Sequence, residues 1–276
     1  MLVNMNEILK DAQANHYAVG LFNVFDTDIL EGILTAAEEL RSPVIIGPVI
    51  YGELKMIAPS MVEMAKRATV PVAVHYDHAT TFERCMEALQ FGFSSVMYDG
   101  SFESMEDNIR HTAEVVKVAH AMGATVEGEI GCVGVAAKGD NAVDDLYTKV
   151  EDAVRFQKET GVDALAIAIG TAHGNYKIKP KLDFQRLQDI RAALDTPLVL
   201  HGGSGLSEDD FRNSIKYGIA KVNIFTDICN AIEEAMLESK QAGENYIEMR
   251  KAKIEAVRRV TTEKIKIFGS EGKYHG

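Results

Sequence analysis

The chain has 276 residues, of which 46% are hydrophobic, so it can bury a large core. Its formal net charge of −12, with no dense run of Lys and Arg, argues against nucleic-acid binding, and its three cysteines form no C-x-x-C pair, which is typical of a reducing compartment. The N-terminus lacks the apolar core of a signal peptide, and no apolar run approaches the roughly 20 residues of a membrane span, so we expect a cytoplasmic protein that binds no membrane.

Short apolar runs alternate with amphipathic stretches along the whole chain. Eight of the apolar runs are predicted strands, at residues 18–24, 43–49, 71–77, 94–100, 125–131, 164–170, 197–203 and 221–226. Helical patterns lie between them, for example at 27–41, 103–123 and 207–218, and the last of these has Ser207 as a candidate N-cap. The highly charged residues 231–268 follow the eighth strand and are also predicted to be helical.

Eight strands, each followed by a helix, predict an α/β fold, a parallel (β/α)₈ TIM barrel with a C-terminal helical extension. A doubly wound open sheet is the alternative, but no G-x-G-x-x-G motif follows the first strand. Since no linker or low-complexity segment marks a second domain, we expect one domain over residues 1–276. Residues 131–149 lack a strand pattern, and we interpret them as a mobile loop.

Metal-ligand and acid–base residues gather where the predicted strands end. Barrel enzymes place their chemistry at the carboxyl ends of the strands, because the loops there meet at one mouth. These ends carry Asn23, Asp77, His78, Asp99, Glu127, Glu129, His173, His201 and Asn223. One histidine at a strand end is usually a surface or hydrogen-bonded residue, but so many residues at one mouth predict an active site.

Three histidines from three strands, His78, His173 and His201, suit a divalent metal. Neutral imidazole is a preferred ligand of Zn²⁺, and three protein ligands leave one position open for a substrate. Asp77 is next to a proposed ligand and could act as a general acid/base. The alternative is that Asp77 orients His78 or His75 through a hydrogen bond.

Two glycine-rich turns, 170–177 and 201–205, follow the sixth and seventh strands. Glycine lets the backbone approach an anion closely, and the helix after Ser207 adds its positive N-terminal end. Together with residues 223–226, the turns match the phosphate site that barrels commonly form near their last two strands. The alternative is that these glycines only make tight turns.

At these residues the sequence resembles the class II, metal-dependent ketose-bisphosphate aldolase family, which includes fructose- and tagatose-bisphosphate aldolases. The matching stretches are 75-HYDHATTFERC-85, 92-GFSSVMYDGS-101, 126-VEGEIGCVG-134, 170-GTAHGNYK-177, 199-VLHGGSG-205, 218-GIAKVNI-224 and 264-KIKIFGSEGK-273. The resemblance implies reversible, zinc-dependent aldol cleavage of a ketose 1-phosphate or 1,6-bisphosphate. The products would be dihydroxyacetone phosphate and an aldehyde, and the protein would be a homodimer or homotetramer.

The resemblance also implies roles for individual residues. Zn²⁺ would be held by His78, His173 and His201, with Glu129 and Asp99 as alternative or outer partners. Asp77 would exchange the proton of the C4 hydroxyl, while the metal would polarise the ketose carbonyl and stabilise the enediolate. The expected contacts to the phosphosugar are Asn23, Gly174, Lys177, Gly202, Gly203, Ser204, Asn223 and Thr226. Backbone carbonyls near Gly174, Gly202 and Ser204 would hold a monovalent cation, Na⁺ or K⁺.

Three regions depart from the family pattern, and in the first, the second strand, Val49 stands at about the position where relatives often have a serine. After the fifth strand, residues 135–137 read Val-Ala-Ala where relatives have Gly and adjacent acids, so Asp140, Asp144 or Asp145 would have to supply the missing carboxylate. After the eighth strand, Phe225 and Cys229 occupy the region that helps relatives to hold a second phosphate. We therefore hypothesise a ketose phosphorylated only at C1, with an aldehyde half other than glyceraldehyde 3-phosphate.

Other functions fit the sequence less well. A metal-dependent barrel hydrolase more often carries an H-x-H pair on its first strand, and residues 18–24 contain no histidine. A class I aldolase needs a Schiff-base lysine, but Lys221 is predicted at the start of the eighth strand, away from the mouth. A non-catalytic sugar-phosphate-binding barrel, or a supporting subunit of an aldolase complex, is the alternative function, which only the altered loop after the fifth strand favours.

Overall fold

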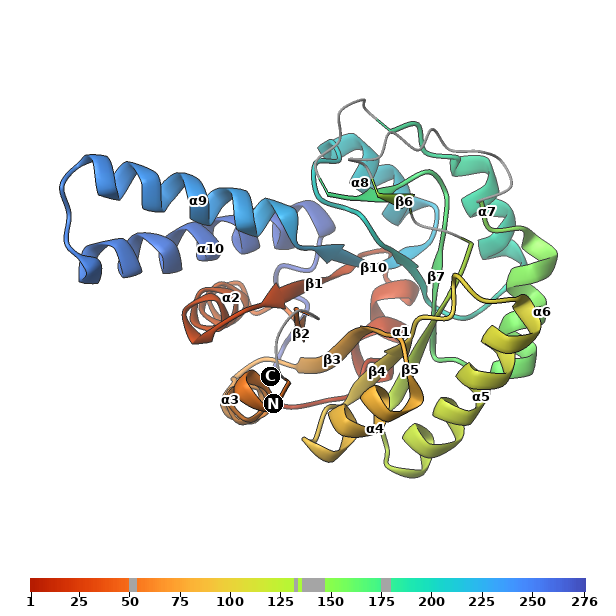
Figure 1. The fold of residues 1–276 in the computed structure, drawn as a ribbon. Coiled ribbons are helices and arrows are strands. Elements are labelled where there is room, and N and C mark those ends of the chain that lie inside the picture. Colours follow the sequence, from red (N-terminus) through yellow and green to blue (C-terminus); the bar gives the residue numbers. More distant parts are fainter. Residues whose placement is uncertain (50–53, 132–133, 136–146, 175–179) are drawn as a thin grey trace.

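The computed structural model describes residues 1–49, 54–131, 134–135, 147–174 and 180–276 (Figure 1). Its centre is a closed barrel of parallel strands in the order β1-β10-β9-β7-β5-β4-β3-β2. The barrel strands are β1 Val19–Val24, β2 Val44–Pro48, β3 Val72–Ala79, β4 Ser95–Tyr98, β5 Thr125–Ile130, β7 Ala164–Ile167, β9 Leu198–Leu200 and β10 Ile219–Ile224. Each predicted strand is therefore present, and the predicted TIM barrel is confirmed.

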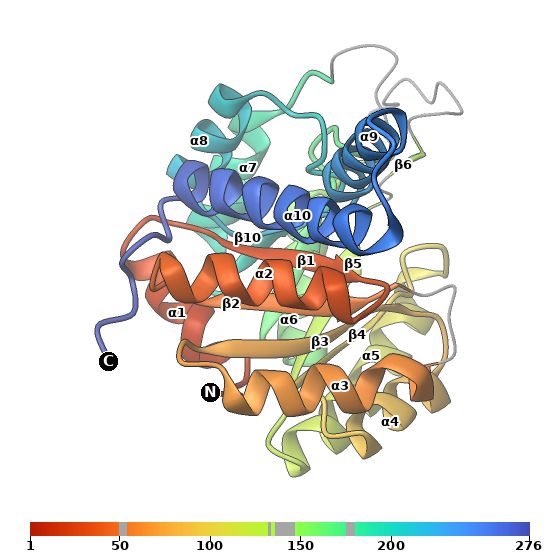
Figure 2. The same cartoon turned by 90° about the vertical axis from the view of Figure 1, so that its left-hand side faces the viewer.

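Helices surround the barrel in both ribbon views (Figures 1 and 2). They are α1 Asn6–Ala14, α2 Thr27–Glu39, α3 Leu54–Arg67, α4 Phe82–Gln90, α5 Met105–Ala121, α6 Val150–Thr160, α7 Phe184–Ala193, α8 Glu208–Lys216, α9 Thr226–Gln241 and α10 Tyr246–Phe268. Among the described residues, no helix is long and apolar enough to cross a membrane.

Side-chain caps fix where several helices begin. The predicted N-cap of α8 is confirmed, because Ser207 and Asp210 form a capping box that satisfies backbone N–H groups of the first turn. Asp26 caps α2 by accepting hydrogen bonds from two backbone N–H groups, those of Asp28 and Ile29. The C-terminal helical region begins at Thr226, earlier than the predicted residue 231, because α9 follows β10 almost directly.

Helices α9 and α10 form an antiparallel pair that projects beyond the barrel, and α10 lies along α2 (Figures 1 and 2). The two helices can approach because α2 has Gly32 at the crossing, where a Cβ atom would lie 2.8 Å from the carbonyl oxygen of Ile254. Ion pairs hold the same contact, with Lys253 Nζ 2.5 Å from Asp26 Oδ2. The extension is therefore attached to the barrel wall by close packing and by charge.

The barrel interior changes character along its axis. Helix α1 closes the amino-terminal end, where Met5 and Leu9 pack with Leu21 of β1 in a buried apolar cluster. On the inward face of β3, Ala73 belongs to this cluster, whereas His75 and Asp77 follow on the same face because strand side chains alternate. The interior is thus apolar at the amino end and polar toward the carboxyl ends of the strands.

The predicted mobile loop at 131–149 lies mostly outside the described residues. Within it, β6 (Gly134–Val135) pairs with β8 (Ala172–His173) in a separate small sheet. The sequence pattern gave no sign of this strand, because two residues are too few to show a period.

Candidate active site

The end of β3 is irregular, and this irregularity aims two successive residues into the mouth. In a regular strand, neighbours such as Asp77 and His78 point to opposite faces. Here the pairing with β4 shifts register between Tyr76 and Ala79, and His78 has a φ of 54°, in the left-handed region that favours glycine. As a result, His78 packs edge-on against His201, with ring centroids 4.7 Å apart, while Asp77 stays buried on the interior face. Such strain in a non-glycine residue is typical of functional sites.

Imidazoles and carboxylates from four strands face one another at this mouth. His78 Nδ1 lies 2.7 Å from Asp99 Oδ2, at the end of β4. His201, directly after β9, places its Nδ1 3.2 Å from Glu129 Oε2 of β5. Asp77 Oδ1 lies 4.0 Å from His78 Nε2. The sequence-predicted residues Asp77, His78, Asp99, Glu129 and His201 are therefore brought together.

This cluster has the composition and the electrostatics of a cation site. The ligand atoms of Asp77, His78 and His201 lie within 4.8 Å of one another, as do those of His78, Asp99 and Glu129. Within the described part of the chain, the buried Glu129 Oε2 receives no hydrogen bond of good geometry. Burial lowers the pKa of His201, but the neighbouring carboxylates outweigh burial and raise it. A cage that attracts protons onto its imidazoles in this way also favours a divalent cation, so these residues fit Zn²⁺.

Asp77 is held as a carboxylate beside this cage. Asn223 of β10 donates its side-chain amide to both carboxylate oxygens, at 3.2 and 3.0 Å. Burial raises the pKa of Asp77, but the imidazoles of His78 and His201 and the ammonium of Lys221 outweigh burial, so the pKa is far below its ordinary value. An ionised, fixed carboxylate next to a cation site can accept a proton from a bound hydroxyl group.

Three buried polar residues lie beneath the cluster; Glu127 was among the predicted strand-end residues but was given no role, and His75 and Lys221 were not among the predicted site residues. Glu127, His75 and Lys221 are fully buried inside the barrel. Lys221 is the third residue of β10 and its ammonium lies 2.8 Å from Glu127 Oε2, so its predicted place at the start of the strand, away from the site, was wrong. A signal was available, since each of the three stands two positions before a candidate residue and shares its face of the strand.

The glycine-rich turn after β9 packs tightly against neighbouring backbone. A Cβ atom on Gly202 would lie 2.5 Å from the carbonyl oxygen of Ala172, and one on Gly203 would lie 3.0 Å from that of Asn223. Ser204 accepts hydrogen bonds from the backbone N–H groups of Phe225 and Asp227 at the start of α9. The turns after β9 and β10 are therefore joined around a helix N-terminus, the kind of place where anions bind.

The remaining candidates are placed only in part. Asn23 is buried near the end of β1, Gly174 directly follows β8, and Thr226 is the first residue of α9. The side chain of His173 is not described, although its backbone belongs to β8. The candidates that lie outside the described residues are Lys177, Asp140, Asp144 and Asp145.

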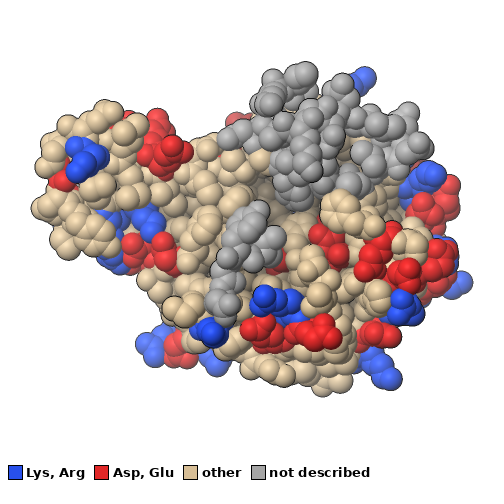
Figure 3. All heavy atoms as spheres, in the orientation of Figure 1, with Lys and Arg blue, Asp and Glu red and all other residues tan. Residues whose placement is uncertain are grey.

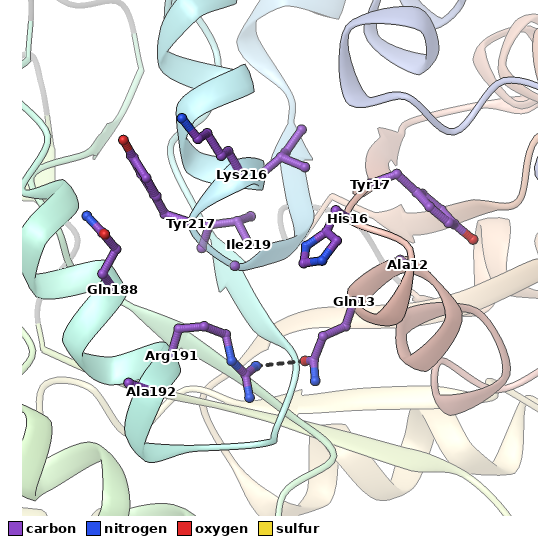
Figure 4. A pocket seen from close by; sticks show the side chains of 12 residues that line it. Ala12, Gln13, His16, Tyr17, Gln188, Arg191, Ala192, Lys216, Tyr217 and Ile219 are labelled. Atoms are coloured by element: carbon purple, nitrogen blue, oxygen red, sulfur yellow. Dashed lines mark hydrogen bonds between the residues drawn. The ribbon is translucent and has the colours of Figure 1, made fainter.

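Elsewhere in the described part of the chain, no group of histidine, cysteine and acidic side chains lies close enough together to hold a metal ion. A cavity of about 390 Å³ lies at the amino end of the barrel, and its lining includes Gln13, Arg191 and Lys216 (Figure 4). Arg191 donates to Gln13 Oε1, and Lys216 lies in the last turn of α8, where the helix carbonyls favour a cation. On the face drawn in Figure 3, the described acidic and basic side chains are interspersed, which gives no continuous track for a phosphate backbone.

Comparisons with known proteins point to one family. The family described as fructose-bisphosphate aldolase class-II matches residues 3–273. The fructose-bisphosphate aldolase of Geobacillus stearothermophilus is 39% identical, over 99% of this chain and 98% of that protein. Escherichia coli K12 has a relative, recorded as uncharacterized protein YdjI, that is 40% identical over 99% of both chains. The crystal structure titled YdjI aldolase from that organism superposes over 100% of both chains, with a TM-score of 0.91 and 38% identity.

Proposed function

Because this chain belongs to the class-II fructose-bisphosphate aldolase family, and is therefore a carbon–carbon lyase, we propose that it cleaves a ketose phosphorylated at C1. The reaction is reversible and gives dihydroxyacetone phosphate and an aldehyde. The observation that carries the proposal is the ionised Asp77, fixed by Asn223 against a cage of imidazoles and carboxylates. The alternative of a non-catalytic barrel rested only on the altered loop after β5, most of which lies outside the described residues, and the aldolase names of the relatives in Geobacillus stearothermophilus and Staphylococcus epidermidis favour a catalytic protein.

Asp77 is the proposed acid/base residue. During cleavage its carboxylate accepts the proton of the C4 hydroxyl, and in condensation it returns that proton to the aldehyde oxygen. The two hydrogen bonds from Asn223 keep both carboxylate oxygens in place, so that little reorganisation is needed during the transfer. Its low pKa keeps the residue ionised at neutral pH, so that a carboxylate is available to accept this proton.

The proposed zinc ligands are His78, His173 and His201, with Asp99 and Glu129 close to them. When bound, zinc supplies a Lewis acid that polarises the ketose carbonyl. Asp99 orients the imidazole of His78 through a contact of 2.7 Å, and Glu129 Oε2 lies 3.2 Å from Nδ1 of His201. The strained backbone at His78 keeps that imidazole at the mouth rather than on the outer face of β3.

The proposed phosphate site lies between the turns after β9 and β10, with Gly202, Gly203 and Ser204 near the N-terminus of α9. A monovalent cation held by backbone carbonyls near Ser204 would offset the phosphate charge. At the rim beside this site, Phe25 and Phe225 pack with ring centroids 5.5 Å apart. An aromatic pair offers no charge to a second phosphate, which supports a preference for a substrate phosphorylated only at C1.

The test is release of dihydroxyacetone phosphate by the purified, zinc-loaded protein. Fructose 1,6-bisphosphate, tagatose 1,6-bisphosphate and fructose 1-phosphate are compared, each with and without a chelator. We expect cleavage that the chelator abolishes and that is at least as fast with the 1-phosphate as with either bisphosphate. Faster cleavage of a bisphosphate would contradict the proposed preference, and no cleavage of any of them would contradict the proposed substrate class.

A further inference from the structure

Lys221 has a buried place under the proposed active site. Its side chain is fully buried, and Nζ lies 2.8 Å from Glu127 Oε2, 3.1 Å from Glu127 Oε1 and 2.8 Å from Asn223 Oδ1. Removing an ammonium from water is costly unless it is paired and hydrogen-bonded, and here three contacts satisfy it. The ammonium therefore occupies one fixed position between Glu127 and Asn223.

The contact between Lys221 and Asn223 determines the orientation of the Asn223 side-chain amide. A lysine ammonium has only donors, so Asn223 must face it with its oxygen. The amide nitrogen then has to point the other way, toward Asp77, where it donates to both carboxylate oxygens. An ionised carboxylate has only acceptors, so the opposite amide orientation would place oxygen against oxygen at Asp77 and nitrogen against nitrogen at Lys221. The charge on Lys221 thus selects the orientation that holds Asp77.

The contact between Lys221 and Glu127 affects His201, a proposed zinc ligand. Lys221 holds Glu127, and Glu127 Oε1 lies 2.8 Å from His201 Nε2. A carboxylate on Nε2 favours the tautomer that carries its proton there, which leaves Nδ1 to face Glu129 and the cage. The same ammonium therefore supports one contact toward Asp77 and another toward His201.

We propose that Lys221 is a positioning residue that orients both the acid/base residue and a zinc ligand, through Asn223 and Glu127 respectively. The inference has two branches. The first, from Lys221 through Asn223 to Asp77, rests on the proposed function. The second branch concerns only metal binding. The competing explanation is an ion pair that stabilises the barrel without affecting either partner.

The first branch is tested by a double-mutant cycle of Lys221→Met and Asn223→Ala, with kcat and KM measured for zinc-loaded protein. If Lys221 acts through Asn223, Lys221→Met lowers kcat by about 10- to 100-fold with little change in KM, but has little further effect once Asn223→Ala is present. A purely structural ion pair predicts the same loss of kcat in both backgrounds. Equal losses would overturn this branch.

The second branch is tested by zinc affinity, measured by competition with a chromophoric chelator and without any substrate. Lys221→Met and Glu127→Gln should each weaken zinc binding by about 10- to 100-fold, and the double variant should be no weaker than the worse of the two. Unchanged zinc affinity in Lys221→Met would overturn the branch. Since this readout needs no turnover, it tests the second branch even if the proposed aldolase reaction is wrong.

Two further variants distinguish a loss of positioning from a general loss of folding. Lys221→Met leaves Glu127 buried without its cation, whereas the combination with Glu127→Gln removes both charges and should fold if the single variant does not. That combination must still show the weaker zinc binding and lower kcat. Lys253→Met removes a matched ammonium from its pair with Asp26 on the outside of the barrel, and should change neither zinc affinity nor kcat.

Discussion

Both ends of the barrel carry hydrogen-bonded acids and histidines, but the two ends use them differently. At the amino end, Asp163 accepts hydrogen bonds from Asn6 Nδ2 at 2.6 Å and from the backbone N–H of Val126 at 2.8 Å, and contacts His120 Nε2 at 2.7 Å. Each carboxylate oxygen there has a donor. The result is a closed network that ties α1, α5 and β5 together.

At the carboxyl end, the hydrogen bonding of the described residues is incomplete. Glu129, Asp99 and Asp77 surround the imidazoles of His78 and His201, and the described groups leave Glu129 Oε2 without a good donor. One of these imidazoles is held on a strained backbone. A cage in which a buried carboxylate oxygen has no donor among the described residues has a place for a cation, whereas a network in which both carboxylate oxygens have donors does not. Hydrogen-bond satisfaction therefore distinguishes the functional cluster from the structural one better than the number of titratable groups does.

Removing the cation should give the largest difference between the two ends. Chelation of zinc should abolish dihydroxyacetone phosphate release, and His201→Ala should prevent its recovery when zinc is restored, because one of three proposed protein ligands is gone. Turnover and bound zinc are measured before and after dialysis against chelator. His120→Ala, at the amino end, is the matched histidine variant and should keep its zinc. Loss of zinc from this variant would contradict the assignment of the cation site to the carboxyl end.

Glu127→Gln should weaken zinc binding by about 10- to 100-fold, because a neutral amide holds His201 less firmly than a carboxylate does. The measurement is a competitive titration with a chelator. An unchanged dissociation constant would mean that Glu127 has only a structural role, like Asp163.

Asp163→Asn should lower the free energy of unfolding by about 1–3 kcal/mol, since an ionised acceptor of several hydrogen bonds becomes a neutral amide. Urea unfolding of the variant and the parent protein measures this change. Zinc affinity and kcat should stay as they are. A variant with normal stability and impaired turnover would reverse the roles assigned to the two ends.

Asp26 shows that an acid at the carboxyl end can be purely structural, and it should give the smallest effect. Burial raises its pKa, but hydrogen bonds from Lys253 and from the backbone of Ile29 and Asp28 outweigh burial and lower it. A lowered pKa stabilises the fold above the unfolded value of about 3.9, and this contribution is lost as the pH falls through the folded pKa.

Asp26→Asn keeps the helix cap and removes only the charge. At pH 7 the variant should be less stable than the parent by less than about 1 kcal/mol, and the difference should disappear in acid. Urea midpoints of both proteins at several pH values measure this difference. A stability difference that grows as the pH falls would contradict the predicted direction of the pH dependence.

The sequence was sufficient for the architecture because the strands of a barrel are continuous apolar runs, and all eight were recognisable. It also placed Asp77, His78 and His201 at one mouth, since the parallel strands of a barrel all end on the same side. The shifted register at His78 was not visible, because a left-handed backbone at a histidine leaves no mark in the sequence.

The buried Lys221 was missed for a different reason. Its strand was recognised, but the strand was taken to begin at residue 221, whereas β10 begins at Ile219. That shift of two residues moved the lysine to the wrong end in the prediction. Its partner Glu127 lies 94 residues earlier in the chain, and only the closed barrel brings the two together.

The central claim is that Asp77, beside a zinc site, performs the proton transfer of aldol cleavage. The most direct measurement compares dihydroxyacetone phosphate release from fructose 1-phosphate by the parent protein and by Asp77→Asn, at equal measured zinc content. We predict that kcat falls by about 10²- to 10⁴-fold while zinc affinity is almost unchanged. Cleavage by Asp77→Asn at the rate of the parent protein would contradict this role for Asp77.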